Sequence, residues 1–203
     1  MEKGQDSAPR LLSEEEIERM LGLPDLDTVA GLRDRAVLEL LCGTGLKVRE
    51  LTGLRLENLD LQISCLLLSE GTGGEGVRMV PFGKRTRTIL LRYVYAVRRD
   101  SEGPSSLVFP GRDKKELSRQ AVWKTVRKYA AAAGIGHPVS PEDLRSSLAV
   151  SLLRAGADPA GVRQMLGIRE AALKRYLVFC GQSPERPLVL EAAAGRNPGG
   201  NCI

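Results

Sequence analysis

Several residue types that mark particular kinds of protein are scarce in this sequence. One histidine in 203 residues makes a histidine-based metal site or a multi-histidine catalytic site an unexpected feature. Aromatic residues are only 4% of the chain, so single-stranded nucleic acid is not expected to bind by stacking. No run of about 18 apolar residues is present, and the N-terminus lacks the apolar segment of a secretory signal. We therefore expect no metal, no cofactor and no membrane partner.

The cysteines are too few and too dispersed for a disulfide framework. They stand at positions 42, 65, 180 and 202, and their spacing matches no common metal-binding pattern. Reduced thiols of this kind are typical of a cytoplasmic protein. A chain of 203 residues with 42% apolar residues is long enough for one domain with a hydrophobic core, but too short for two full domains.

Basic residues are concentrated in two segments. The chain carries 30 Lys and Arg against 25 Asp and Glu. Residues 84–99 contain six basic and no acidic side chains, and residues 112–128 contain seven basic and two acidic ones. Because a solvated surface normally mixes the two signs, this skew favours a polyanionic partner; a merely soluble basic surface is the alternative.

Apolar periodicity and helix start signals predict a mainly helical α+β domain. Residues 58–68 and 77–82 read as strands of a small antiparallel sheet inserted after the first helices, separated by the glycine-rich segment SEGTGGEG. Ser13 and Glu16 form a capping-box pattern, and Ser118, Ser140 and Asp158 are expected N-caps. The predicted helices cover residues 14–21, 30–42, 48–54, 84–99, 118–133, 140–155, 159–167 and 170–180.

The predicted helix at 118–133 is amphipathic in a way that suits DNA. Apolar residues from Val122 to Ala133 fall on one side, and Lys124, Arg127 and Lys128 fall roughly opposite. Such a helix can lie against a groove and its phosphates, although an ordinary surface helix has the same pattern. The candidate residues for binding double-stranded DNA are Arg85, Arg87, Arg119, Lys124, Arg127 and Lys128.

The order of motifs resembles the catalytic domain of the tyrosine recombinases (phage integrases), in particular the Xer type. The matching segments include GLRDRAVLELLCGTGLKVRELTGLRLENLDL (31–61), VRMVPFG (77–83), LVFPGRDKKELSRQAVWKTVRKYAAAAGI (107–135) and VSPEDLRSSLAVSLLRAGADPAGVRQMLGI (139–168). The resemblance implies the recombinase catalytic-domain fold over residues 12–182, after a flexible lead-in at 1–11 and before a C-terminal tail at 183–203.

The resemblance also implies a reaction and its residues. In the family, a tyrosine attacks the scissile phosphate, and two arginines hold its nonbridging oxygens. Tyr176 stands where the nucleophile belongs, and Arg145 stands at the second arginine. Lys47 occupies the place of the first arginine; lysine keeps the charge but loses the bidentate fork.

Three other positions depart from the family pattern. Glu142 replaces the histidine of the His-x-x-Arg motif, and its carboxylate would repel a phosphate. Ile168 replaces the histidine expected after Leu-Gly, and it can neither donate nor accept a proton. The hairpin lysine has no counterpart, because the glycine-rich segment offers only Thr72. Since a dianionic transition state requires preorganised positive charge, we expect a catalytically impaired member of the family.

Purely structural roles are an alternative for these residues. Tyr176 is three residues from Leu173 and can be a core aromatic on the last helix. Arg145 can pair with Glu142, which also suits the first turn of its helix.

Three functional hypotheses follow. The first is a DNA-binding accessory or regulatory factor in recombination or integration, associated with the nucleoid, whose protein partners are an active recombinase or further copies of the chain. The second is an active recombinase that uses Tyr176, and the third is a protein-interaction module on the same fold. Only about ten residues precede the match, so we expect no N-terminal clamp and a weaker, more salt-sensitive grip on DNA. Residues 183–194 are a candidate segment for docking on a neighbouring protomer.

Overall fold

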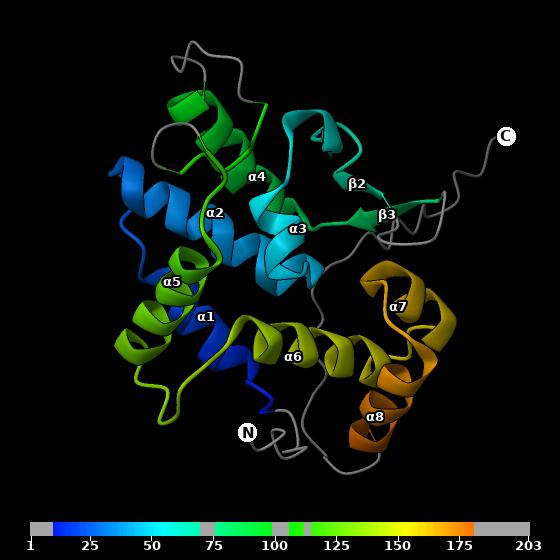
Figure 1. Ribbon diagram of the computed structural model, residues 1–203. Coiled ribbons are helices and arrows are strands. Elements are labelled where there is room, and N and C mark those ends of the chain that lie inside the picture. Colours follow the sequence, from blue (N-terminus) through cyan, green and yellow to red (C-terminus); the bar gives the residue numbers. More distant parts are fainter. Residues whose placement is uncertain (1–9, 70–75, 99–105, 112–114, 181–203) are drawn as a thin grey trace, which may run out of the picture.

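The computed structural model describes residues 10–69, 76–98, 106–111 and 115–180 (Figure 1). These residues form a mainly helical domain with one small antiparallel sheet, as the sequence predicts. A 3₁₀ turn, η1 (Leu56–Asn58), precedes the sheet, and a π-helical segment, η2 (Val94–Arg98), extends α4. The α-helices are α1 (Glu14–Gly22), α2 (Val29–Thr44), α3 (Val48–Thr52), α4 (Lys84–Tyr93), α5 (Arg119–Ala132), α6 (Pro141–Arg154), α7 (Pro159–Leu166) and α8 (Glu170–Cys180).

The helices begin where the sequence provides a cap. The side chains of Ser13, Ser118, Ser140 and Asp158 each accept a hydrogen bond from a backbone amide in the first turn of the helix that follows. Ser13 and Glu16 form the predicted capping box. These N-terminal boundaries are therefore confirmed, because each is fixed by a local hydrogen bond that the sequence itself encodes.

The sheet contains one more strand than the sequence indicates. Its order is β1 (Leu59–Asp60), β2 (Cys65–Ser69) and β3 (Val77–Pro81), with both pairings antiparallel. The predicted run 58–68 is wrong as a single strand. The Asp60 carboxylate accepts hydrogen bonds from the amides of Gln62 and Ile63, and Ser64 adopts a φ of 57°, so the chain reverses inside the run.

Helix α2 is the centre of the fold. It packs against α4, α6, α1 and α5, and it crosses the middle of the molecule in Figure 1. Its buried leucines lie on several faces of the helix and include Leu32, Leu38, Leu40 and Leu41. Because residues are buried around nearly the whole helix, including the charged Asp34 and Glu39, neighbours must cover it on every face, which explains why most other elements surround it.

A second, smaller core joins α6, α7 and α8. It contains Leu148, Ala149, Val150, Val162, Leu166 and Tyr176. Helices α7 and α8 lie at the right-hand side of Figure 1, below the sheet, and α7 contacts β3. This second core therefore fixes the C-terminal end of α7 next to the sheet and the end of α2.

Some sequence predictions concern residues outside the described ranges. They are most of the lead-in at 1–11, Thr72 in the glycine-rich segment, and the tail at 183–203 with its docking segment 183–194. Within the described ranges, no helix is both long and apolar enough to cross a membrane.

Candidate active site and nucleic-acid interface

Arg145 is buried at the junction of α6, α7 and the end of α2. Only 2% of the residue is exposed. Its guanidinium donates to the carbonyl oxygen of Gly45 and, at 2.5 Å, to that of Leu166. Burial lowers the pKa of this arginine, while the nearby Glu142 carboxylate raises it. The side chain thus ties together segments far apart in the sequence.

Lys47 lies just before α3 and reaches the same place. Its Nζ donates to the carbonyl oxygen of Gly167 at 3.2 Å and lies 4.0 Å from Oε1 of Glu50. Its side chain is 40% exposed. Partial burial lowers the pKa of the Lys47 amine, and the Glu50 carboxylate opposes this shift. Lys47 is therefore the most accessible cation at this point of the structure.

Arg78 is a third cation at the site, and the sequence interpretation missed it. It comes from β3, is 4% exposed, and donates through Nε to the carbonyl oxygen of Met165 at 3.2 Å. Its Nη2 donates to Oε2 of Glu50 at 2.8 Å. No local signal was available: apolar Val77 and Met79 flank Arg78 and would be expected to face inward, but the structure leaves both exposed and buries Arg78 instead. A charge at such a position requires a buried partner.

These three side chains, Lys47, Arg78 and Arg145, form a cation cluster around the end of α7. Each donates to a different carbonyl oxygen, and the three carbonyls belong to consecutive residues, 165, 166 and 167. The last carbonyls of a helix have no partner within the helix and carry the negative end of its dipole. The cluster therefore supplies the hydrogen-bond donors that the last carbonyls of α7 lack within the helix.

Tyr176 lies beside this cluster but faces the protein interior. The residue is 4% exposed and packs in the second core. Its hydroxyl lies 3.4 Å from Oγ of Ser146, the residue after Arg145. The structure thus brings Lys47, Arg145 and Tyr176 to one region, and the side chains of Arg145 and Tyr176 are buried there.

The positions that depart from the family pattern lie at the edge of the cluster. The Glu142 side chain is 67% exposed, and its Oε1 is 4.0 Å from Nε of Arg145. Ile168 is partly buried against the second core. The Glu142 carboxylate is therefore an exposed negative charge next to the buried Arg145 guanidinium.

The six predicted DNA-binding residues divide into two groups. Arg85 pairs with Glu18 at 2.6 Å and with Glu39 at 3.1 Å. Arg87 donates to the carbonyl oxygen of Leu61, and Lys128 lies 3.7 Å from Asp34. These three cations have partners inside the protein.

Arg119, Lys124 and Arg127 form the second group, on α5. All three are exposed, and no carboxylate of the described residues lies within ion-pair distance of them. Helix α5 buries Val122, Val126, Tyr129 and Ala130 on its opposite side. The helix thus presents cations outward from a fixed base, which suits contact with phosphates.

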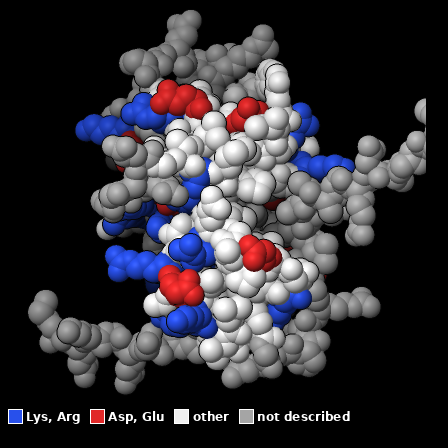
Figure 2. Space-filling view, turned by 90° about the vertical axis from the view of Figure 1, so that its right-hand side faces the viewer, with Lys and Arg blue, Asp and Glu red and all other residues white. Residues whose placement is uncertain are grey.

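A further basic surface covers α7 and α8. Figure 2 looks onto this side of the molecule and shows more Lys and Arg toward its left edge than toward its centre, with some acidic side chains beside them. The exposed basic residues of this segment are Arg163, Arg169, Lys174 and Arg175. One acid, Glu170, lies 3.9 Å from Arg163. The sequence interpretation missed this surface because its cations are interrupted by apolar residues.

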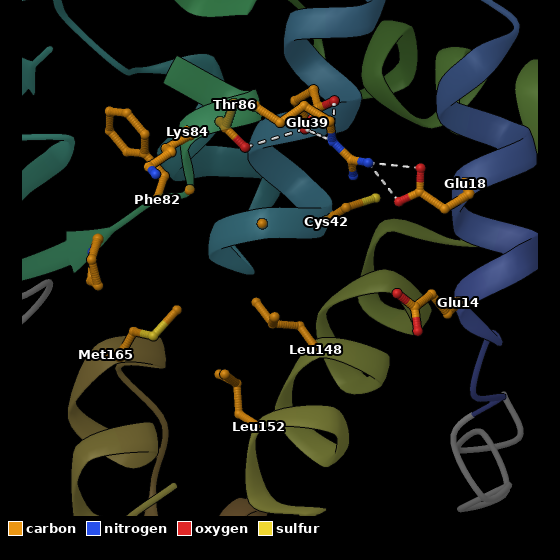
Figure 3. A pocket seen from close by; sticks show the side chains of 14 residues that line it. Glu14, Glu18, Glu39, Cys42, Phe82, Lys84, Thr86, Leu148, Leu152 and Met165 are labelled. Carbon is orange, nitrogen blue, oxygen red and sulfur yellow. Dashed lines mark hydrogen bonds and ion pairs between the residues drawn. The ribbon is translucent and has the colours of Figure 1, made fainter. Parts of the chain in front are cut away.

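A pocket of about 240 Å³ lies between α1, the start of α4, α6 and α7 (Figure 3). Leu148, Leu152 and Met165 line its apolar part, while Glu14 and Glu18 extend from α1 on the other side. Of the predicted site residues, only Arg85 contributes to it, and that arginine is paired with Glu18. Three carboxylates, of Glu14, Glu18 and Glu39, line it against two cations, Lys84 and Arg85, so its charge does not favour a phosphate. No group of three or more His, Cys, Asp or Glu in the described ranges is placed to hold a metal ion.

The lowered pKa of Lys47 leads to a prediction about its reactivity. Because its neutral amine is more populated at a given pH, Lys47 is expected to be acylated faster than the exposed Lys124 near neutral pH. The advantage is expected to shrink as the pH rises, because the lowered pKa then no longer changes how much of the Lys47 amine is neutral. Peptide mapping by mass spectrometry after brief treatment with acetic anhydride measures both rates; equal rates at neutral pH would contradict the prediction.

The comparisons with known proteins agree with this architecture. The phage integrase family profile matches residues 10–176. The chain is 40% identical over 165 residues to tyrosine recombinase XerD of Neisseria meningitidis serogroup B, covering 78% of this chain and 54% of the relative. It is 38% identical over 161 residues to XerD of Pseudomonas aeruginosa, covering 78% and 53%. The chain thus spans about half the length of these curated relatives.

Solved structures show the same fold. The XerA recombinase crystal structure superposes with a TM-score of 0.72 at 26% identity, covering 86% of this chain and 60% of that one. The XerH recombinase bound to a palindromic difH substrate gives a TM-score of 0.76 at 21% identity, covering 87% and 52%. Together with the family profile, these similarities show that the chain belongs to the phage integrase family of tyrosine recombinases.

Proposed function

We propose that this protein binds double-stranded DNA and is impaired in strand cleavage, acting as an accessory or regulatory factor in recombination or integration. The observation that carries the proposal is that the cation cluster is already occupied by carbonyl oxygens of the protein itself. Lys47, Arg78 and Arg145 each donate to a carbonyl at the end of α7, and the hydroxyl of Tyr176 faces Ser146 in the interior. A phosphate would have to displace these contacts or share their donors before it could be held.

The residue types around the cluster support the same proposal. Lys47 offers a point charge in place of a planar fork. Glu142 places a carboxylate beside the phosphate position, and Ile168 supplies neither a donor nor an acceptor. Loss of a single oxyanion donor or general acid costs on the order of 10²- to 10³-fold in rate, so several such losses together leave little activity.

The exposed cations of α5 and of α7–α8 support DNA as the partner. Relatives with this fold have been solved with DNA, including XerH bound to a difH substrate and the Tn1549 transposon integrase in complex with circular intermediate DNA. Contacts from lysine and arginine to phosphates give binding that weakens steeply with salt. A protein that holds DNA in this way belongs with the nucleoid.

A nicked duplex that traps a covalent protein–DNA adduct tests the cleavage part of the proposal. Such a substrate is designed on the site of an active XerD relative, which serves as the positive control. We expect no adduct from this protein under conditions where the relative forms one. An adduct that disappears in Tyr176→Phe would overturn the proposal and favour an active enzyme. That second candidate has one specific observation on its side, the proximity of Lys47, Arg145 and Tyr176.

A salt titration of duplex binding tests the other part. We expect the double variant Arg119→Ala, Lys124→Ala to bind mixed-sequence duplex at least tenfold more weakly, with a shallower dependence on salt, because about two phosphate contacts are lost. The control is Arg92→Ala, an exposed arginine of α4 that pairs with Asp27. Binding that is unchanged in the double variant would count against DNA contact through α5. A pull-down with and without nuclease then separates DNA binding from a pure protein-interaction role.

A further inference from the structure

Trp123 on α5 stands out among the exposed residues. It is the only tryptophan of the chain, and it is 39% exposed although it lies on a well-packed helix. Its neighbours in the buried face, Val122 and Val126, fix the helix so that Trp123 points outward. A large aromatic side chain left in solvent between cations is typical of a binding surface.

Arg127 lies one helical turn after Trp123 and is held by it. The guanidinium carbon of Arg127 is 5.5 Å from the centroid of the indole ring and lies over that ring. Residues four apart on a helix are neighbours, so the pair is set by α5 alone. A cation over an aromatic face is attracted by the ring quadrupole, which restricts the guanidinium without using its N–H donors.

The neighbouring cation shows a different arrangement. Nζ of Lys128 lies 4.4 Å from the centroid of the Tyr129 ring, 3.1 Å from the Tyr129 hydroxyl and 3.7 Å from Oδ2 of Asp34. The hydrogen bond from Lys128 to Tyr129 raises the pKa of this lysine. Lys128 is therefore bound to the protein, whereas Arg127 keeps its donors available among the described residues.

There is also room beside Arg127. An open groove of about 510 Å³ runs past it, lined by small or compact residues that include Ala131, Gly136 and Pro138. Among the described residues that line this groove, His137 and Pro138 have the only rings, and Nδ1 of His137 lies 3.3 Å from the backbone carbonyl oxygen of Pro138. Arg127 therefore borders an open groove between the end of α5 and residues 135–139.

We propose that Trp123 and Arg127 act as one base-reading unit, in which the indole holds the guanidinium so that it reads a guanine edge in the major groove. An α-helix fits this groove, and arginine donates in a bidentate manner to O6 and N7 of guanine. The inference rests on the proposed function, DNA binding through α5. Beside this unit, Lys124 and Arg119 contact phosphates; such contacts position the helix without reading the sequence.

Selection from a pool of duplexes with a randomised centre tests the unit. The wild-type protein is expected to enrich guanine at one position or at two adjacent ones. Arg127→Ala and Arg127→Lys are expected to lose that enrichment about tenfold, because lysine keeps the charge but not the fork. Trp123→Leu is expected to reduce the guanine enrichment by less than Arg127→Ala does. Lys124→Ala is the matched control and is expected to weaken all sequences equally.

The single tryptophan provides a readout that does not depend on selection. Its emission should shift or be quenched on titration with the selected duplex, and Arg127→Ala should reduce this response while far-UV circular dichroism stays unchanged. If no duplex is retained even at low salt, the proposed function falls and this inference with it. Two outcomes would overturn only the base-reading unit while duplex is still retained. They are guanine enrichment that survives in Arg127→Ala, and Trp123 emission that does not change when the duplex is added.

Discussion

Replacement of Arg145 by alanine is expected to lower the free energy of unfolding by about 3–5 kcal/mol, one of the two largest effects expected of a single substitution here. The guanidinium is 2% exposed and donates to the carbonyl oxygens of Gly45 and Leu166. Alanine leaves both oxygens buried without donors and leaves a cavity at the junction of α6 and α7. Urea denaturation followed by circular dichroism measures the loss.

Two further variants show whether the effect comes from these contacts. Arg145→Lys keeps the charge but cannot reach both carbonyls, so an intermediate loss is expected. Arg169→Ala removes an exposed arginine close to the end of α7 and is expected to change stability by less than about 0.5 kcal/mol. If Arg145→Ala were as stable as Arg169→Ala, Arg145 would not hold the end of α7, and the occupied cluster would lose its main support.

Replacement of Tyr176 by alanine is expected to cost about 3–5 kcal/mol in the free energy of unfolding. The ring packs in the second core with Leu148, Val162 and Leu166, so its removal leaves a cavity between α6, α7 and α8. Tyr176→Phe keeps the ring and loses only the 3.4 Å contact with Ser146, so a loss of less than about 1 kcal/mol is expected. Thermal or urea unfolding of both variants measures the difference.

The pair of Tyr176 variants separates a core role from a purely chemical one. A solvent-facing nucleophile would make both substitutions nearly neutral for stability, contrary to the burial seen here. Conversely, equal and large losses in both variants would mean that the hydroxyl, rather than the ring, holds α8 in place. The matched control is Leu177→Ala, the next residue on α8, which is 41% exposed and is expected to have a small effect.

Under the proposed function, the cation cluster links the stability of this domain to its DNA chemistry. The donors that satisfy the end of α7 are the same cations that the proposal assigns to a phosphate. Binding a phosphate would therefore require that α7 give up these contacts or share them. Substitutions at Lys47, Arg78 and Arg145 are accordingly expected to affect folding first, and they need a stability measurement beside any activity assay.

The helical framework was predictable because it depends on local signals. Caps at Ser118, Ser140 and Asp158 and the apolar periodicity of α2 and α5 lie within a few residues of the structure they specify. The family resemblance likewise placed Lys47, Arg145 and Tyr176 in one region. The division of the first predicted strand was missed, because the Asp60 turn that causes it lies inside an apolar run.

By itself, the sequence determined the helices, the apolar core and the family to which the chain belongs. Only the tertiary structure decided which contacts the candidate site residues make, because these contacts join residues far apart in the chain: Lys47 with Gly167 across 120 positions, and Arg145 with Gly45 across 100. The role of Arg78 was decided in the same way, since a buried charge on a strand can be interpreted only when its partners, Glu50 and the carbonyl of Met165, are known. Side-chain spacing encodes local geometry, whereas the pairing of a cation with a distant carbonyl depends on how the helices pack.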